Sequence, residues 1–242
     1  MIFREFKDCI EKGLDELSLD YDDNKIIKLW EYMNFLLKEN KKYNLTNITE
    51  EKEVIKKHFF DSLAPLSMVE INFAENILDL GTGPGFPGMV LKIFFPEKKF
   101  LLLDSTLKKV NFLKLLSAEL ESYNNLEIKH GRAENFAKNN KYREKYDLVL
   151  SRAVAPLNIL AEYTLPFTSK GGLLYFYKGP DFQKEIKNSK KSFQKLGGKY
   201  LDAIELKIPG LDAERYLIIY KKVKNTPKKF PRRAGIPKKR PL

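Results

Sequence analysis

The chain has 242 residues, of which 43% are hydrophobic and 31% charged, a balance that excludes a disordered protein and leaves room for one catalytic domain with a small appendage. It has no apolar run long enough to span a membrane, no apolar export segment at its start and a single cysteine, Cys9, so we expect a cytoplasmic protein without disulfides. The formal net charge of +12 favours a polyanionic partner such as nucleic acid.

The first part of the chain has a helical pattern. Within residues 22–42, apolar side chains recur at the spacing of one helical face: Ile26, Leu29, Trp30, Met33, Leu36 and Leu37. A polar break over residues 43–47 ends this helix, and Thr49 with the two glutamates after it suits the start of another, which runs to about residue 68. Residues 1–72 are therefore predicted to form a helical N-terminal extension.

From residue 76, short apolar runs alternate with helical segments, which is typical of a parallel sheet with crossover helices. The predicted strands cover residues 77–80, 100–103, 126–128, 147–150 and 173–177, and helices are expected after Phe86 and near residues 106–121, 134–139, 156–167 and 181–196. Two further strand-like runs, 200–208 and 215–220, are joined at 209–212 and predict an antiparallel hairpin. The fold class is thus α/β: a doubly wound, mainly parallel, seven-stranded sheet with a terminal antiparallel hairpin, over residues 73–224.

Residues 225–242 differ in composition from the rest of the chain. They contain many Lys and Arg, several Pro and no Asp or Glu, which predicts an extended basic C-terminal arm. We expect Arg232 and Arg233 in this arm to bind RNA phosphates, which would give affinity without sequence choice. A solvated basic tail is the alternative.

The strongest motif is the glycine-rich segment that follows the first predicted strand. Glycines at 81, 83 and 85 let the backbone turn sharply and approach a ligand, so Gly81, Gly83 and Gly85 are predicted to bind a nucleoside cofactor. In a shifted register the segment also satisfies the dinucleotide pattern G-x-G-x-x-G, which binds a pyrophosphate. S-adenosylmethionine instead carries a sulfonium and an α-amino group, and an acidic residue just before the glycines, Asp79, suits these cations better.

Later segments add to the cofactor site and favour a methyltransferase. Asp104 ends the second predicted strand, where a carboxylate can accept hydrogen bonds from ribose hydroxyls. Glu134 follows the third strand, where an acid can hold the edge of an adenine. The turn at 165–172 and the terminal hairpin resemble the last part of class I methyltransferases and not a dinucleotide dehydrogenase domain.

Several basic residues are placed to meet a cofactor or RNA. Arg152 ends the fourth predicted strand, so its guanidinium can face the cleft and contact either the cofactor carboxylate or an RNA phosphate. Three more candidates for RNA contacts are Arg132, Lys178 and Arg215. With two histidines and one cysteine in the chain, no His/Cys metal site is expected, and His58 is expected to pack between helices or to form a hydrogen bond rather than to act as a base.

The end of the fourth strand bears on the chemistry. Residues 151–156 lack the tetrad that enzymes methylating exocyclic amines carry there, and Cys9 lies too far from the catalytic half to be a nucleophile for pyrimidine C5. Guanine N7 has an outward lone pair and needs no base to remove a proton. Holding the methyl donor and the base in line can then supply most of the rate enhancement, so no catalytic residue is expected.

Taken together, the motifs resemble the bacterial 16S rRNA guanine-N7 methyltransferase G family, also called the glucose-inhibited division protein B family. The resemblance is nearly full length and rests on residues 43–46, 58–63, 79–88, 131–134, 151–153 and 231–237. Met89 and Ile236 depart from the usual pattern, but neither affects the cofactor chemistry.

The resemblance implies methyl transfer from S-adenosyl-L-methionine to N7 of one guanine in a 16S rRNA loop near the decoding centre. It also implies that these residues line the cofactor site: Gly81, Phe86, Asp104, Ser105, Thr106, Ala133, Glu134 and Arg152. The expected partner is 16S rRNA or a small ribosomal subunit assembly intermediate. We expect the protein to act as a monomer and not to associate with a membrane. A methyltransferase of another RNA or a small molecule, a dinucleotide oxidoreductase and a non-catalytic ribosome-binding factor remain as alternatives.

Overall fold

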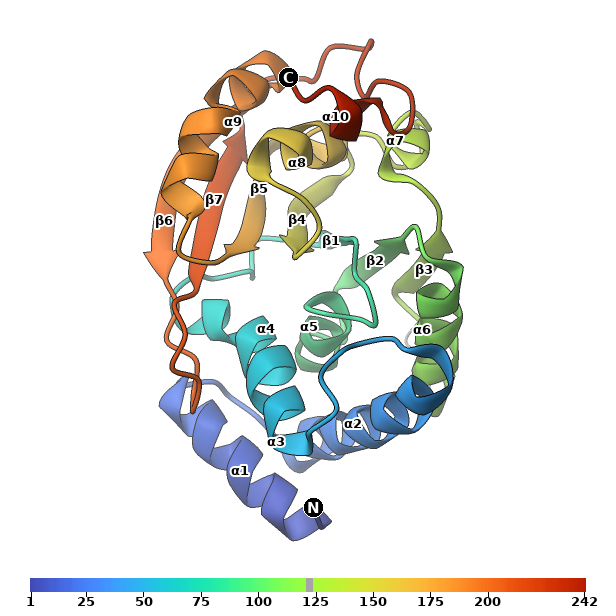
Figure 1. Ribbon diagram of the computed structural model, residues 1–242, viewed down its shortest axis with the longest axis vertical. Coiled ribbons are helices and arrows are strands. Elements are labelled where there is room, and N and C mark those ends of the chain that lie inside the picture. The colour runs from blue at the N-terminus through green and yellow to red at the C-terminus, as the bar shows by residue number, and fades with distance from the viewer. Residues whose placement is uncertain (121–123) are drawn as a thin grey trace.

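The computed structural model describes residues 1–120 and 124–242 and has a central sheet flanked by helices on both faces (Figure 1). Within these residues the sheet has seven strands in the order β3-β2-β1-β4-β5-β7-β6. Their bounds are β1 Asn76–Leu80, β2 Lys99–Asp104, β3 Leu126–His130, β4 Tyr146–Arg152, β5 Thr168–Lys178, β6 Gly198–Glu205 and β7 Tyr216–Lys222. Strands β1 to β5 are parallel, whereas β7 is antiparallel to both β5 and β6. This arrangement confirms the predicted fold class.

Alternate residues of each strand face opposite layers of helices. On one face, Ile77, Phe100 and Leu148 join a hydrophobic cluster with α5, Gly88–Phe94, and α6, Leu107–Glu119. On the other face lie α7 Ala133–Phe136, α8 Leu157–Thr164 and α9 Phe182–Leu196. The predicted helix near residues 106–121 matches α6, although Glu121 lies outside the described residues.

The N-terminal helices extend the first of these layers. They are α1 Phe3–Glu16 and α2 Asp23–Tyr43, and the α2 N-cap Asp22 accepts a hydrogen bond from the Lys25 N–H. The helix expected up to about residue 68 is a succession of short turns, namely α3 Glu51–Val54, the π-helical η1 Ile55–Phe60, α4 Asp61–Leu63 and the 3-10 helix η2 Ala64–Ser67. A π turn inside a helix re-aims its side chains and often marks a functional site.

Two details at the C-terminal end differ from the prediction. The connection between β6 and β7 covers residues 206–215 and is longer than the turn expected at 209–212, with an isolated bridge between Ile208 and Leu211. The basic arm is not extended, because it packs on the protein and forms α10, Ile236–Lys239, beside α8. Phe230 is buried in the cluster under α8 and α9, which explains why the arm stays docked.

None of the helices in the described residues is both long and apolar enough to cross a membrane.

Candidate functional site

A carboxylate ties the glycine-rich loop to the end of the neighbouring strand. Asp104, the last residue of β2, accepts a hydrogen bond from the Gly83 N–H at 2.8 Å with one oxygen and from the Thr106 N–H at 2.7 Å with the other. Gly83 has φ +61°, in the left-handed region that favours glycine, and an added Cβ would meet no atom closer than Lys109 Nζ at 3.9 Å. The backbone of the loop is therefore open to a ligand and fixed by Asp104 at the same time.

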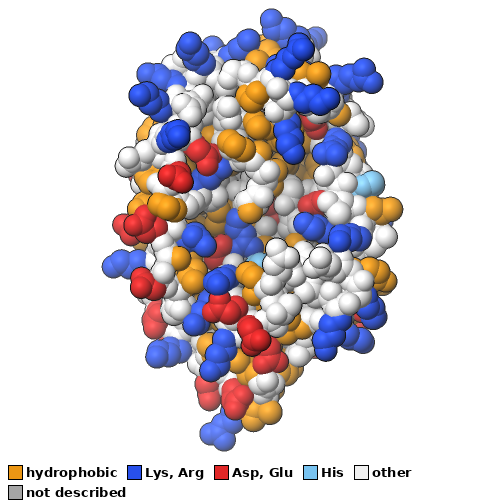
Figure 2. All heavy atoms as spheres, viewed as in Figure 1, with side chains coloured by type: hydrophobic (Ala, Val, Ile, Leu, Met, Phe, Trp, Pro, Cys, Tyr) orange, Lys and Arg blue, Asp and Glu red, His pale blue; other side chains and the backbone are white. Residues whose placement is uncertain are grey.

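Beneath this loop, at the carboxyl edge of the sheet, lies a pocket of about 240 Å³. Parallel sheets bind their ligands at this edge. Five of the predicted residues line it: Gly81, Ser105, Ala133 and Glu134 from the cofactor set, and Arg132 from the RNA set. The other lining residues are Leu80, Leu103, Gly131, Val154, Ala155, Pro156, Ile159, Tyr163 and Lys238. Figure 2 shows that this face of the molecule is hollowed near its middle, with Lys and Arg side chains around the hollow.

Asp79 provides a test of whether the site fits a cationic cofactor. Its side chain is buried on β1, and one oxygen accepts a hydrogen bond from the Gly88 N–H at 2.8 Å. The other oxygen, Oδ1, is buried and makes no well-formed hydrogen bond among the described residues, and the Thr82 hydroxyl, which is also buried and unpaired, is the side-chain donor beside this carboxylate. Burial raises the pKa of Asp79 from 3.8 to about 6. A buried carboxylate with an unpaired oxygen beside the glycine loop fits the amino group and sulfonium of S-adenosylmethionine, whereas it would oppose a pyrophosphate.

The raised pKa of Asp79 predicts a pH-dependent stability. Below about pH 3.8 this carboxyl is protonated in both states, and between pH 3.8 and 6 only the folded state keeps the proton, so the free energy of unfolding falls as pH rises through this window. We therefore expect Asp79→Asn to stabilise the cofactor-free protein by about 1–3 kcal/mol near pH 7.5 and much less near pH 4. The same change should weaken S-adenosylhomocysteine binding at neutral pH. Chemical denaturation at both pH values, with and without this ligand, tests the prediction, and a variant destabilised near pH 7.5 would contradict it.

The N-terminal helices support the glycine-rich loop directly. Tyr32 of α2 donates a hydrogen bond from its hydroxyl to the Pro84 carbonyl at 2.6 Å, and its ring stacks on Phe86 with centroids 5.2 Å apart. The His58 ring stacks on the same phenylalanine at 4.2 Å. Phe86 is thus packed between two rings from the extension and does not line the pocket.

Arg152 lies next to this stack and forms a buried ion pair with Asp61 of α4. Its guanidinium also donates to the Lys57 carbonyl at 3.1 Å and lies 3.3 Å from His58 Nδ1. Burial and the positive charge of Arg152 lower the pKa of His58 to about 3, so this imidazole is neutral and suited to packing, as the sequence predicts. Arg215 adds a longer contact, 3.6 Å from its Nε to Asp61 Oδ1.

The remaining basic candidates have different environments. Lys178 pairs with Glu185 at 2.8 Å and donates to the Ala155 carbonyl, so it lies near the pocket wall. Arg232 makes several hydrogen bonds to the fully buried Glu162, the shortest at 2.6 Å. Arg233, by contrast, is exposed to solvent. Arg132 is also exposed, but it lines the pocket, whereas Arg233 does not.

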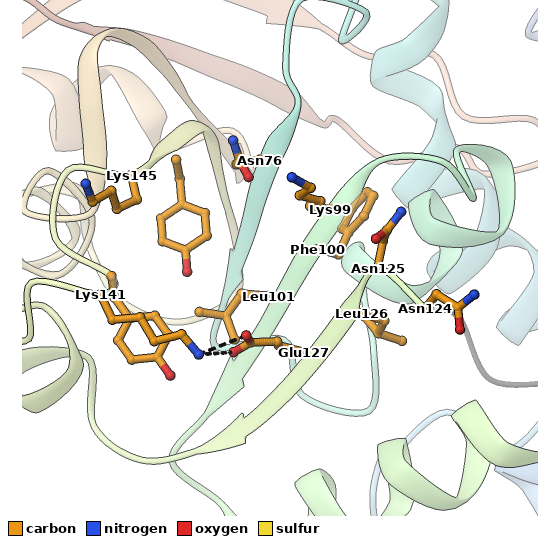
Figure 3. A pocket seen from close by; sticks show the side chains of 12 residues that line it. Asn76, Lys99, Phe100, Leu101, Asn124, Asn125, Leu126, Glu127, Lys141 and Lys145 are labelled. Atoms are coloured by element: carbon orange, nitrogen blue, oxygen red, sulfur yellow. Dashed lines mark hydrogen bonds and ion pairs between the residues drawn. The ribbon is translucent and has the colours of Figure 1, made fainter.

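A larger hollow, about 440 Å³, lies at the opposite edge of the sheet (Figure 3). It is lined by the amino ends of β1, β2 and β3 and by the segment before β4, and Lys141 spans part of it to pair with Glu127 at 3.0 Å. Its lysines, Lys99, Lys141 and Lys145, are exposed. Size alone does not make it the functional site, because the glycine-rich loop and Asp104 are at the other edge.

Sequence reasoning missed several residues that the structure brings to the site. Tyr32 lies within the helix predicted from residues 22–42 but is not among the residues of its predicted apolar face, and Asp61 lies in the 58–63 motif without a predicted role. Lys238 of the arm was grouped with the other basic residues, although it lines the pocket. Among the described residues, no group of His, Cys, Asp and Glu is arranged to hold a metal ion.

Comparison with known proteins links this chain to one family. Residues 25–215 match the family described as rRNA small subunit methyltransferase G. The chain is 43% identical over 238 residues to "Ribosomal RNA small subunit methyltransferase G" of Alkaliphilus metalliredigens, covering 98% of this chain and 99% of the relative. It is 45% identical to the protein of the same name from Desulforamulus reducens, covering 96% and 97%.

Solved structures of lower identity share the fold. An O-methyltransferase from Bacillus cereus in complex with SAH has a TM-score of 0.58 at 14% identity, and the match covers 91% of this chain and all of that one. A putative methyltransferase in complex with the Haloferax volcanii Trm112 activator has a TM-score of 0.55 at 12% identity, covering 73% and 94%.

Proposed function

Because this chain belongs to the rRNA small subunit methyltransferase G family, we propose that it transfers a methyl group to N7 of one specific guanine in 16S rRNA near the decoding centre. It is an S-adenosylmethionine-dependent rRNA methyltransferase with a class I methyltransferase fold. The observation that supports the proposal most is the pocket under the glycine-rich loop, with Asp104 fixing the loop and Asp79 offering an unpaired buried oxygen.

When bound, S-adenosylmethionine supplies a methyl group on a positively charged sulfur. Guanine N7 would form the new N–C bond with its lone pair as the methyl C–S bond breaks, S-adenosylhomocysteine would leave as a neutral thioether, and no proton is lost, so no residue has to serve as a general base. In agreement with this, His58 is neutral and stacked on Phe86, and Asp61 is occupied by Arg152. The protein's own contribution is to hold cofactor and base in line, which can supply much of the barrier reduction.

The proposed cofactor contacts follow the geometry. We propose that Gly81, Gly83 and Gly85 present backbone to the ligand, that Asp104, Ser105 and Thr106 contact the ribose, and that Ala133 and Glu134 contact the adenine. Support comes from the pocket, which is lined by four of these residues: Gly81, Ser105, Ala133 and Glu134. Arg152 and Phe86 act behind the loop, where their contacts fix its position.

For RNA we propose contacts by Arg132, Lys178, Arg215, Arg232 and Arg233 around the mouth of the cleft. Arg233 is the most accessible of the arm residues among these, whereas Arg232 would have to share its guanidinium with Glu162. We further propose that the chain acts as a monomer in the cytoplasm, on 16S rRNA or a small-subunit assembly intermediate. In this proposal residues 1–72 support the loop, 73–224 carry catalysis and 225–242 form the arm.

The test is to incubate the protein with radiolabelled S-adenosylmethionine and unmodified small ribosomal subunits or free 16S rRNA. Label should appear at one guanine that borohydride and aniline cleave, as N7-methylguanine requires. Gly83→Asp, which places a side chain where the loop is open, should abolish it. Label that resists cleavage would refute N7 as the acceptor, and no label on any RNA despite intact cofactor binding would return a small-molecule substrate to consideration.

A further inference from the structure

The C-terminal arm makes a specific contact with the cofactor pocket. The Gly235 N–H, just before α10, donates a hydrogen bond to Glu134 Oε1 at 2.9 Å. Glu134 is only 3% exposed and lines the pocket, and its second oxygen, Oε2, has no hydrogen-bond partner among the described residues. One oxygen of this carboxylate is thus held by the arm, while the other remains available to a ligand.

The arm itself is anchored on both sides of this contact. Arg232 donates its backbone N–H and its guanidinium to Glu162, which is 0% exposed. Arg143 donates to the Phe230 carbonyl at 2.8 Å and to the Thr226 carbonyl at 2.9 Å. These contacts join segments 70 to 87 residues apart in the chain. The arm is therefore packed as part of the tertiary structure. Figure 1 shows α10 between α7, which carries Glu134, and α8.

Lys238 extends the contact into the pocket. It is the one residue of the arm that lines this pocket, together with Glu134 and Tyr163. Lys238 is itself exposed, as are Lys239 and Arg240, which follow directly and do not line the pocket. Of these three exposed basic residues, Lys238 is therefore the one that borders the pocket.

We propose that the arm is a positioning element for the cofactor: Gly235 holds the Glu134 carboxylate so that its free oxygen accepts a hydrogen bond from the 6-amino group of adenine, and Lys238 borders that end of the pocket. This inference rests on the assigned cofactor, S-adenosylmethionine, and extends it to a segment otherwise assigned only to RNA. A carboxylate held at one oxygen loses less side-chain freedom on binding than a free one, and it discriminates against a base that presents an acceptor at the same place.

The experiment uses two ligands and needs no RNA. S-adenosylhomocysteine carries the 6-amino donor, and S-inosylhomocysteine carries a carbonyl oxygen there. Calorimetry should show that the full chain prefers the first. A chain ending at Arg232 keeps Phe230 and the Glu162 pair, so it should fold, yet it should bind S-adenosylhomocysteine about tenfold more weakly and lose most of its preference. The matched control, Lys239→Ala with Arg240→Ala, removes charge but not the contact and should bind as the full chain does.

A second variant covers the case in which the shortened chain does not fold. Gly235 has φ +85° and no atom within 4 Å of an added Cβ, so Gly235→Val has space but must shift the backbone that carries the amide. It should reduce the preference for the adenine ligand in the same direction. Unchanged affinity and preference in these variants, or an equal loss for both ligands, would overturn the proposal. Failure of the full chain to bind S-adenosylhomocysteine would instead overturn the cofactor assignment, and the proposal with it.

Discussion

Replacing Asp104 by alanine is expected to weaken cofactor binding about 100-fold or more, because two backbone amides lose a charged acceptor and, in the proposed site, the ribose loses its carboxylate. Asp104 is 7% exposed, so water cannot freely replace the lost oxygens. The Gly83 amide would be left without its partner, and the loop that carries the cofactor would lose its fixed distance from β2. The effect should appear mainly in affinity.

Isothermal titration with S-adenosylhomocysteine measures this effect, and methylation of small subunits at saturating cofactor shows how much of the rate is recovered. Asp104→Asn should be intermediate, since its single carbonyl oxygen can accept from only one side. Asp202→Ala on β6 is the matched control, because Asp202 is an exposed acid that, among the described residues, accepts a hydrogen bond only from the N–H of the next residue, Ala203. Affinity within about twofold of the unmodified chain in Asp104→Ala would show that the loop is held by other contacts.

The second large effect is expected at Arg152, and it concerns stability. Arg152→Ala leaves Asp61 as a buried charge without its main partner, which costs about 3–5 kcal/mol of unfolding free energy. For a chain of this size the midpoint of thermal unfolding should fall by roughly 6–20 °C. The longer contact from Arg215 to Asp61 can offset only part of the loss.

Removing both partners of the pair is the informative comparison. Arg152→Gln combined with Asp61→Asn leaves no buried charge and should regain a large part of the lost stability. Lys141→Ala provides the control, because it breaks an exposed ion pair with Glu127 and should cost no more than about 1 kcal/mol. A midpoint unchanged in Arg152→Ala would mean that this arginine serves only a ligand.

The sequence predicted best the features that depend on neighbouring residues. The glycine-rich turn, Asp104 at a strand end and Glu134 at a helix start follow from local patterns, and parallel topology then brings them to one edge. The ion pairs could not be foreseen in this way. Arg152 and Asp61 are 91 residues apart, and Lys222 and Glu144 are 78 apart. Local sequence shows which residues are charged but not which distant partner makes their burial favourable.

The arm illustrates the same limit. Its composition predicted an extended, solvated segment, since a run of basic residues without acids has no local partner. The acids that hold it, Glu162 and Glu134, come from elements synthesised much earlier, and Phe230 adds an apolar anchor. The composition correctly predicts that Lys239 and Arg240 are exposed to solvent. It wrongly predicts the same for Arg232, which is half-buried.

The packing of α1 also bears on how the chain is made. Leu14 and Leu17 share a hydrophobic cluster with Leu206 and Ile208, which lie in the connection between β6 and β7, and Figure 1 shows this connection reaching α1. Contacts between the two ends of a chain form late and slow its folding. During translation α2 can cover much of the first helix early, as the packing of Phe6 on Trp30 indicates, but Leu14 and Leu17 gain their cluster partners Leu206 and Ile208 only when the last connection has been made. The end of α1 that carries Leu14 and Leu17 is therefore the part of the N-terminal extension most exposed to misassociation before synthesis is complete.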